Sequence, residues 1–146
     1  MFDIDKDNRI LEFLNSAPRF KVVVLGDDSF DASLSHVNVG KTVANYLKEH
    51  NLSKQAFDGV KDFLSSQITA ITQVDDQFGK YICLTNLGIL FEKVLDFSPA
   101  DFLSTISKNT LLLLHWQGTI KQNKLFFLDE DSPLYIDLQN INYITI

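Results

Sequence analysis

The chain has 146 residues, enough for one domain with a sizeable core, and its 45% hydrophobic and 22% charged residues are ordinary for a globular protein. A net charge of −6 and only two arginines leave no concentrated cationic surface, which argues against direct binding to nucleic acid. The first residues are acidic and no segment holds about 18 apolar residues, so we expect neither a signal peptide nor a membrane span, and a cytoplasmic location.

Apolar runs and helical stripes alternate along the first hundred residues. Residues 20–25 form a continuous apolar, largely β-branched run closed by Gly26, which is typical of a strand buried on both faces of a parallel sheet. Residues 34–39 and 81–84 predict two more strands, and the second contains Cys83, the only cysteine, which we expect to be buried. Three helices are predicted: 7–14, 40 to about 50, and one from 51 or 53 to 71.

The last fifty residues predict a helix followed only by strands. Ser98-Pro99-Ala100-Asp101 is a helix start, and this helix ends near Asn109. Residues 111–114 form the third buried strand, whereas 124–128, 134–138 and 142–146 predict short strands around an acidic turn. We expect these to add antiparallel edge strands, with Pro133 excluded from a central position. The alternation as a whole predicts a single α/β domain over residues 1–146, with a mainly parallel sheet and right-handed crossovers.

Gly40-Lys41-Thr42 matches the end of a Walker A motif, G-x-x-x-x-G-K-[ST]. In that motif backbone N–H groups wrap the phosphates, the lysine reaches the outer phosphates and the hydroxyl holds Mg²⁺. Here Ser35 replaces the first glycine, and two of the four intervening residues are β-branched valines that resist positive φ. The residues before Gly40 also resemble the strand itself, which leaves no length for a loop. A strand end and helix start is the favoured interpretation; a divergent ATP–Mg site at Gly40, Lys41 and Thr42 is the alternative.

Gly26 is better placed for a phosphate loop because it follows the first strand directly. However, Asp27 and Asp28 come next and would repel a phosphate, and no Lys-Ser or Lys-Thr follows at the required spacing. The Gly-Asp-Asp-Ser sequence has a faint likeness to the Gly-Asp-Ser opening of lipase-like hydrolases. That chemistry needs a histidine held by an acid, and His36, His50 and His115 include no Asp-x-x-His pair, so we disfavour it.

Three segments follow one another in a characteristic order: YICLTNLGILF at 81–91, SKNTLLLLHWQG at 107–118 and LFFLDEDSPLY at 125–135. From about Leu34 onward this order resembles the small P-loop protein of BREX-type phage-defence systems, a bacterial family of about this length. There the segments correspond to a Walker B strand, a core strand with a Trp-x-Gly turn, and a terminal hairpin. The resemblance implies a three-layer P-loop-NTPase-like domain, mainly parallel, with a C-terminal antiparallel β-hairpin extension.

The chain departs from that family at the positions that carry its chemistry. Thr85 stands where the family has the Walker B aspartate, and Gly88 stands where it has an acid. The segment between Gly26 and His36 is too short for a phosphate loop and its helix. The resemblance therefore implies a non-catalytic accessory subunit without a bound cofactor, which binds other proteins of a defence complex. Self-association is compatible with the sequence, and an unrelated interaction module is a further alternative.

Three other segments carry side chains that are candidate ligand contacts. Lys108 and Asn109 lie where nucleotide sensors can sit, but a helix C-terminal cation and cap is favoured. His115 and Trp116 end the third strand on the side where α/β proteins bind ligands, and a packed aromatic edge is favoured over a ligand contact. The acidic turn at 129–131 is best explained as a solvated hairpin tip, with cation binding as the alternative.

Overall fold

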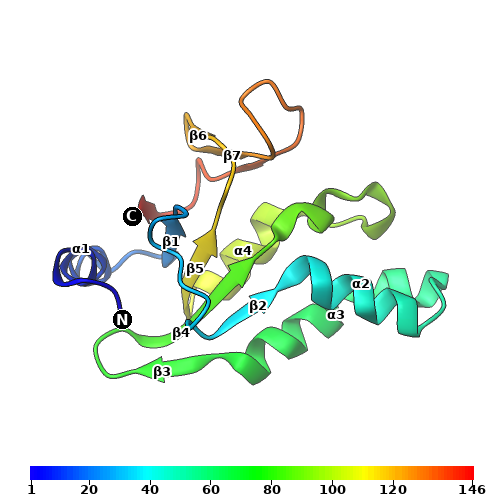
Figure 1. Ribbon diagram of the computed structural model, residues 1–146, viewed down its shortest axis with the longest axis horizontal. Coiled ribbons are helices and arrows are strands. Elements are labelled where there is room, and N and C mark those ends of the chain that lie inside the picture. Colours follow the sequence, from blue (N-terminus) through cyan, green and yellow to red (C-terminus); the bar gives the residue numbers. More distant parts are fainter.

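A mainly parallel sheet forms the centre of the structure, a computed structural model that describes residues 1–146 (Figure 1). Its five parallel strands lie in the order β2 (His36–Asn38), β4 (Gly79–Thr85), β5 (Leu111–His115), β1 (Val22–Leu25) and β9 (Tyr143–Thr145). A sixth strand, β3 (Gln73–Asp75), pairs with β4 in the antiparallel direction. The α/β class and the mainly parallel sheet are thus confirmed.

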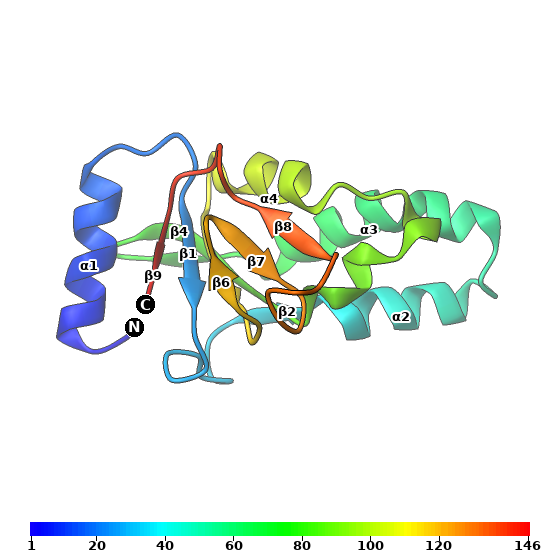
Figure 2. The same cartoon turned by 90° about the horizontal axis from the view of Figure 1, so that it is seen from above.

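Helices cover both faces of this sheet and make three layers. Because successive side chains of a strand point to opposite faces, the alternate valines of β1 contact different helices. Val23 packs with Ile10 of α1 (Ile4–Asn15), whereas Val22 and Val24 belong to the core formed with α2 (Val39–Glu49), α3 (Lys54–Ile71) and α4 (Pro99–Ser107). Figure 2 shows α1 on one side of the strands and α2–α4 on the other.

The predicted elements occur in the predicted order, with small shifts of their ends. Side-chain caps explain two of the helix starts: Asp3 accepts a hydrogen bond from the backbone N–H of Lys6, and Ser53 from that of Ala56. Ser53 is therefore the cap of α3, one of its two predicted starts. Two short 3₁₀ helices, η1 (Leu87–Phe91) and η2 (Lys93–Leu95), follow β4 in a region without a prediction. None of the helices has the length and apolar character that crossing a membrane requires.

The C-terminal strands differ from the expectation of antiparallel edge strands. β9 pairs in parallel with β1, because the chain returns to the amino ends of the strands before it enters the sheet. β6 (Ile120–Lys121), β7 (Lys124–Phe126) and β8 (Tyr135–Asp137) instead form a separate antiparallel sheet. This β6–β8 sheet is the predicted hairpin extension, but it does not extend the main sheet. Figure 1 shows it above the carboxyl ends of β1 and β5.

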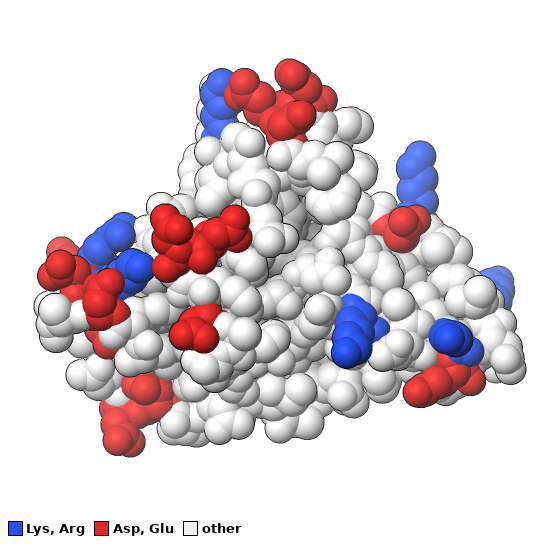
Figure 3. Space-filling model, in the orientation of Figure 1, with Lys and Arg blue, Asp and Glu red and all other residues white.

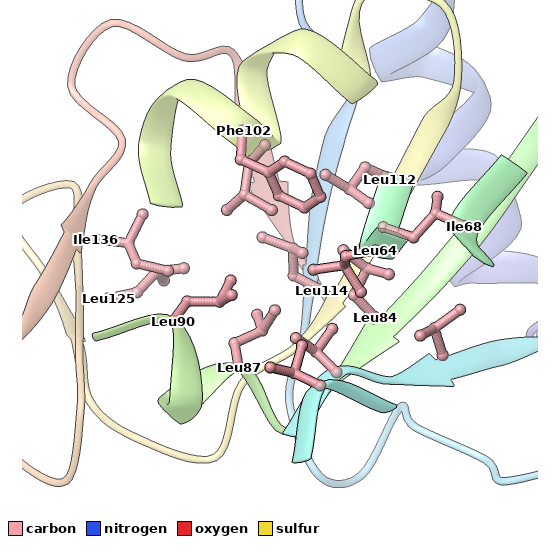
Figure 4. Close-up of a cluster of buried hydrophobic side chains, with 14 of the residues drawn as sticks. Leu64, Ile68, Leu84, Leu87, Leu90, Phe102, Leu112, Leu114, Leu125 and Ile136 are labelled. Atoms are coloured by element: carbon pink, nitrogen blue, oxygen red, sulfur yellow. The ribbon is translucent and has the colours of Figure 1, made fainter. Parts of the chain in front are cut away.

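One cluster of buried side chains joins the helices, the main sheet and the β6–β8 sheet (Figure 4). Leu64 comes from α3, Leu114 from β5 and Leu90 from η1, and all three are fully buried or nearly so. Leu125 of β7 and Ile136 of β8 complete the cluster with exposed fractions of 0% and 2%. The β6–β8 sheet is therefore fixed to the main core through its apolar face.

Cys83 lies in β4 against the face of the sheet that α1 covers, and it is fully buried. Burial raises the pKa of its thiol from 9.0 to about 12, because a thiolate there would lose its hydration. We expect Cys83 to resist iodoacetamide at pH 8 in the folded protein and to react at once in urea. Because the pKa of the thiol is higher in the folded protein than in the unfolded chain, the protonated thiol contributes fully to the free energy of unfolding below pH 9. This contribution is lost as the pH rises from 9 to 12. Rapid labelling of the native protein would contradict this.

Candidate functional site

The carboxyl ends of β1, β4 and β5 meet at one edge of the sheet, where open α/β sheets bind ligands. We call it the carboxyl edge. A pocket of about 230 Å³ lies there, between the ends of β4 and β5 and the β6–β8 sheet. Its lining combines main-chain turns with three aromatic rings: Asn86, Leu87, Gly88, His115, Trp116, Gln117, Gly118, Phe127 and Leu128.

The chain leaves β1 through a tight turn and not through a phosphate loop. The Gly26 N–H donates to the carbonyl of Ile146 at 3.0 Å, and the Gly26 carbonyl accepts from the N–H groups of Ser29 and Phe30. No helix lies between β1 and β2. A helix N-terminus that could hold phosphate is therefore missing directly after β1.

Gly40, Lys41 and Thr42 form the first turn of α2, directly after the edge strand β2. This is the favoured strand end and helix start. Asn38 caps the helix by accepting from the Lys41 N–H at 2.9 Å, and the Gly40 N–H donates to the Asn86 carbonyl at 2.9 Å. A Cβ at position 40 would overlap the Asn86 side chain. A glycine here therefore makes room for a contact within the protein, and Lys41 is exposed to solvent.

The two positions that carry acids in the resembled family are built into the protein's own packing. Thr85 is the last residue of β4 and only 7% exposed. Gly88 lies under the Phe127 ring, which a Cβ at position 88 would approach to 2.6 Å. Phe127 directly follows β7, and its ring occupies the space that an acidic side chain at position 88 would need.

His115 and Asp27 form a pair that the sequence analysis did not find. The His115 Nε2 and the Asp27 Oδ1 are 2.8 Å apart, and the His115 ring stacks on Phe30 with 4.1 Å between ring centroids. The residues are 88 positions apart in the chain. The pairing of Leu25 with His115 brings them together, and a parallel alignment of the two apolar runs could have indicated it. No side-chain hydrogen bond joins Ser29 to His115 in this structure.

The remaining candidate residues are distributed around the fold. Lys108 and Asn109 are exposed and precede β5, so they lie at the amino ends of the strands, away from the pocket. Trp116 is 6% exposed and its Nε1 donates to the Phe126 carbonyl at 3.1 Å, as expected of a packed aromatic edge. The acidic residues 129–131 are exposed in the β7–β8 connection, where Glu130 pairs with Lys121 at 2.7 Å.

Acidic side chains surround the carboxyl edge. Asp27, Asp28 and Asp31 are exposed in the segment after β1, and the backbone N–H of Ser33 holds the pKa of Asp31 below its usual value. Figure 3 shows acidic side chains gathered over the β6–β8 sheet and again beside it. Because like charges repel, this surface opposes the approach of a phosphate and favours neutral or cationic partners.

No protein-family model, curated protein or solved structure matches this chain significantly.

Proposed function

We propose that this chain is a non-catalytic, P-loop-derived accessory subunit of a bacterial phage-defence system, which acts by binding other proteins. The observation that carries the proposal is the turn after β1, which replaces both the phosphate loop and the helix that would follow it. Phosphoryl transfer depends on positioning and charge stabilisation, and single groups of this kind contribute about 10²–10³ in rate. A chain without several of them has lost nearly all of that acceleration.

Two features of the fold support a P-loop ancestry. β1 is the second strand from one edge of a parallel sheet, with β5 and β9 beside it, and its carboxyl end meets that of the Walker B-like strand β4 at one edge. The YICLTN segment forms β4 and the turn that follows it, as the resemblance implies. Under this proposal, Thr85 and Gly88 stand in place of the acids of an ancestral nucleotide site.

Exposed apolar side chains support a role in protein binding. Large apolar residues are normally scattered singly over a protein surface, whereas a group of them marks an interaction site. Four belong to η2 or to the β7–β8 hairpin, on the same end of the molecule as the pocket. Their exposed fractions are 59% for Val94, 76% for Leu128, 39% for Leu134 and 40% for Tyr135.

The alternative function is a nucleotide-binding switch or weak NTPase at Gly40, Lys41 and Thr42. One observation favours it: Lys41 is exposed in the first turn of the eleven-residue helix α2. Against it, the Gly40 and Lys41 N–H groups already donate to Asn86 and Asn38. No further donor loop precedes the helix.

Nucleotide binding separates these functions. We expect calorimetry with millimolar ATP, ADP or GTP and Mg²⁺ to give no binding heat, because no group remains to cradle the phosphates. Lys41→Ala should then behave like the parent chain, both in calorimetry and in phosphate release. Micromolar affinity for ATP that disappears in Lys41→Ala would overturn the proposal. Copurification of the full chain from its host should yield a stoichiometric complex with defence proteins; recovery of the chain alone would also count against it.

A further inference from the structure

An apolar groove lies beside the pocket, between the η1–η2 segment and the β7–β8 connection. Its volume of about 650 Å³ falls within the range of natural ligand sites, about 300–1,000 Å³. Five apolar side chains line it: Ile89, Phe91, Val94, Phe127 and Leu134. Phe127 also lines the pocket, so the two hollows share one wall.

Two of the five apolar side chains of this groove are exposed to solvent. Val94 and Leu134 are 59% and 39% exposed, and the neighbouring Leu128 is 76% exposed. Leu128 also has a φ of 79°, a left-handed conformation that costs a residue other than glycine about 1–3 kcal/mol. The fold therefore keeps the Leu128 side chain exposed beside the groove, although its backbone conformation is unfavourable.

The rim of the groove carries a net negative charge. Glu92 lines the groove, and the acidic residues 129–131 lie in the connection between Phe127 and Leu134. Glu130 is paired with Lys121, which leaves Asp129 and Asp131 without a cation, and Lys93 is the single cation in the lining. In Figure 3 the acidic side chains at the top lie over the β7–β8 connection, beside a hollow in the surface.

We propose that this groove binds a basic, apolar peptide segment of a partner protein. Apolar side chains of the segment would enter between η1–η2 and Phe127, and its lysine or arginine side chains would meet the acidic rim. A second copy of the chain fits poorly, since each copy has a net charge of −6 and would bring its own acidic rim. This inference rests on the proposed function and specifies the chemistry of the partner.

Three fluorescein-labelled synthetic peptides test the inference by fluorescence anisotropy with the full chain. The first has leucines at helical spacing with lysines between them, the second replaces the lysines with glutamates, and the third replaces the leucines with serines. We expect the first to bind at least about tenfold more tightly than either of the others, and to weaken as salt is raised. Equal binding of the lysine and glutamate peptides would overturn the proposal.

Paired variants locate the binding surface. Val94→Asp combined with Leu134→Asp places two charges in the groove. We expect this double variant to bind the lysine peptide at least about tenfold more weakly than the parent chain does. Val74→Asp is the matched control, because Val74 is 74% exposed on β3 and lies outside the groove. The affinity of this control variant for the lysine peptide should equal that of the parent chain. The inference is wrong if the two proteins bind equally, or if sedimentation finds a dimer that the double variant dissociates.

The outcomes distinguish this inference from the proposed function. If a defence complex forms normally with the groove variants, the accessory role stands and the groove is not the surface that binds the partner. Micromolar ATP binding through Lys41 would remove the proposed function, whatever the peptides do.

Discussion

Gly118→Ala is expected to lower the free energy of unfolding by about 3 kcal/mol, the upper end of the range for overpacked sites. A Cβ at position 118 would overlap the backbone carbonyl of Phe126 and lie 3.0 Å from the Trp116 Nε1. A backbone atom cannot rotate away as a side chain can. The strand β7 would have to move, and the hydrogen bond from Trp116 to Phe126 would break.

Urea unfolding followed by circular dichroism gives the stability change. Fluorescence of Trp116, the only tryptophan, reports separately on the β6–β8 sheet, and its emission should shift to the red in the variant. Gly26→Ala is the matched control, because the nearest atom to its Cβ is the Ile146 carbonyl oxygen at 3.8 Å and its φ is not positive. We expect that control to remain within about 1 kcal/mol of the parent chain. Similar losses in both variants would contradict this account.

Gly88→Glu is the second change with a large expected effect, a loss of about 2–3 kcal/mol. It places an acid at the position where the resembled family has one. Here the new Cβ would approach the Phe127 ring to 2.6 Å, and the carboxylate would be forced into an apolar contact. We therefore expect loss of the Phe127 packing and no gain of ATP hydrolysis, even together with Thr85→Asp.

Val94→Glu provides the comparison for Gly88→Glu, since it adds the same charge at a side chain that is 59% exposed. Surface changes of this kind usually alter stability by less than about 0.5 kcal/mol. Chemical denaturation and Trp116 fluorescence are measured on both variants, with phosphate release as the activity readout. A stable Gly88→Glu protein that hydrolyses ATP would show that the acid position is still functional.

The sequence was a good guide to the elements of the main sheet. Residues 20–25 and 111–114 are short, continuous apolar runs, and strands buried on both faces need that pattern. β9 was predicted as a strand but in the wrong direction. Its few residues do not specify a strand direction. The direction depends on the end of the main sheet at which the chain arrives after the β6–β8 sheet. β3 was missed because Gln73–Asp75 is a short, mostly polar segment. It forms a strand only by pairing with β4 in an antiparallel hairpin.

The candidate site was less accessible to sequence reasoning. The short segment after Gly26, and the departures of Thr85 and Gly88 from the resembled family, could be read directly from the sequence because they lie within local motifs. The packing of Phe127 over Gly88 could not, because only the folded structure brings these two residues together. The pairing of His115 with Asp27 was missed, although aligning the two apolar runs in parallel could have indicated it. The reason for Gly40 likewise lies in a distant residue, Asn86.

The position of β1 has a consequence for biosynthesis. Val22 pairs with Leu112 on one side and with Tyr143 on the other, so both partners lie about 90 to 120 residues later in the chain. During translation this valine-rich strand emerges long before either neighbour exists, with both hydrogen-bonding edges open. Such a segment can pair with other nascent chains. Correct folding therefore depends on keeping Val22–Leu25 from associating until β5 and then β9 have been made.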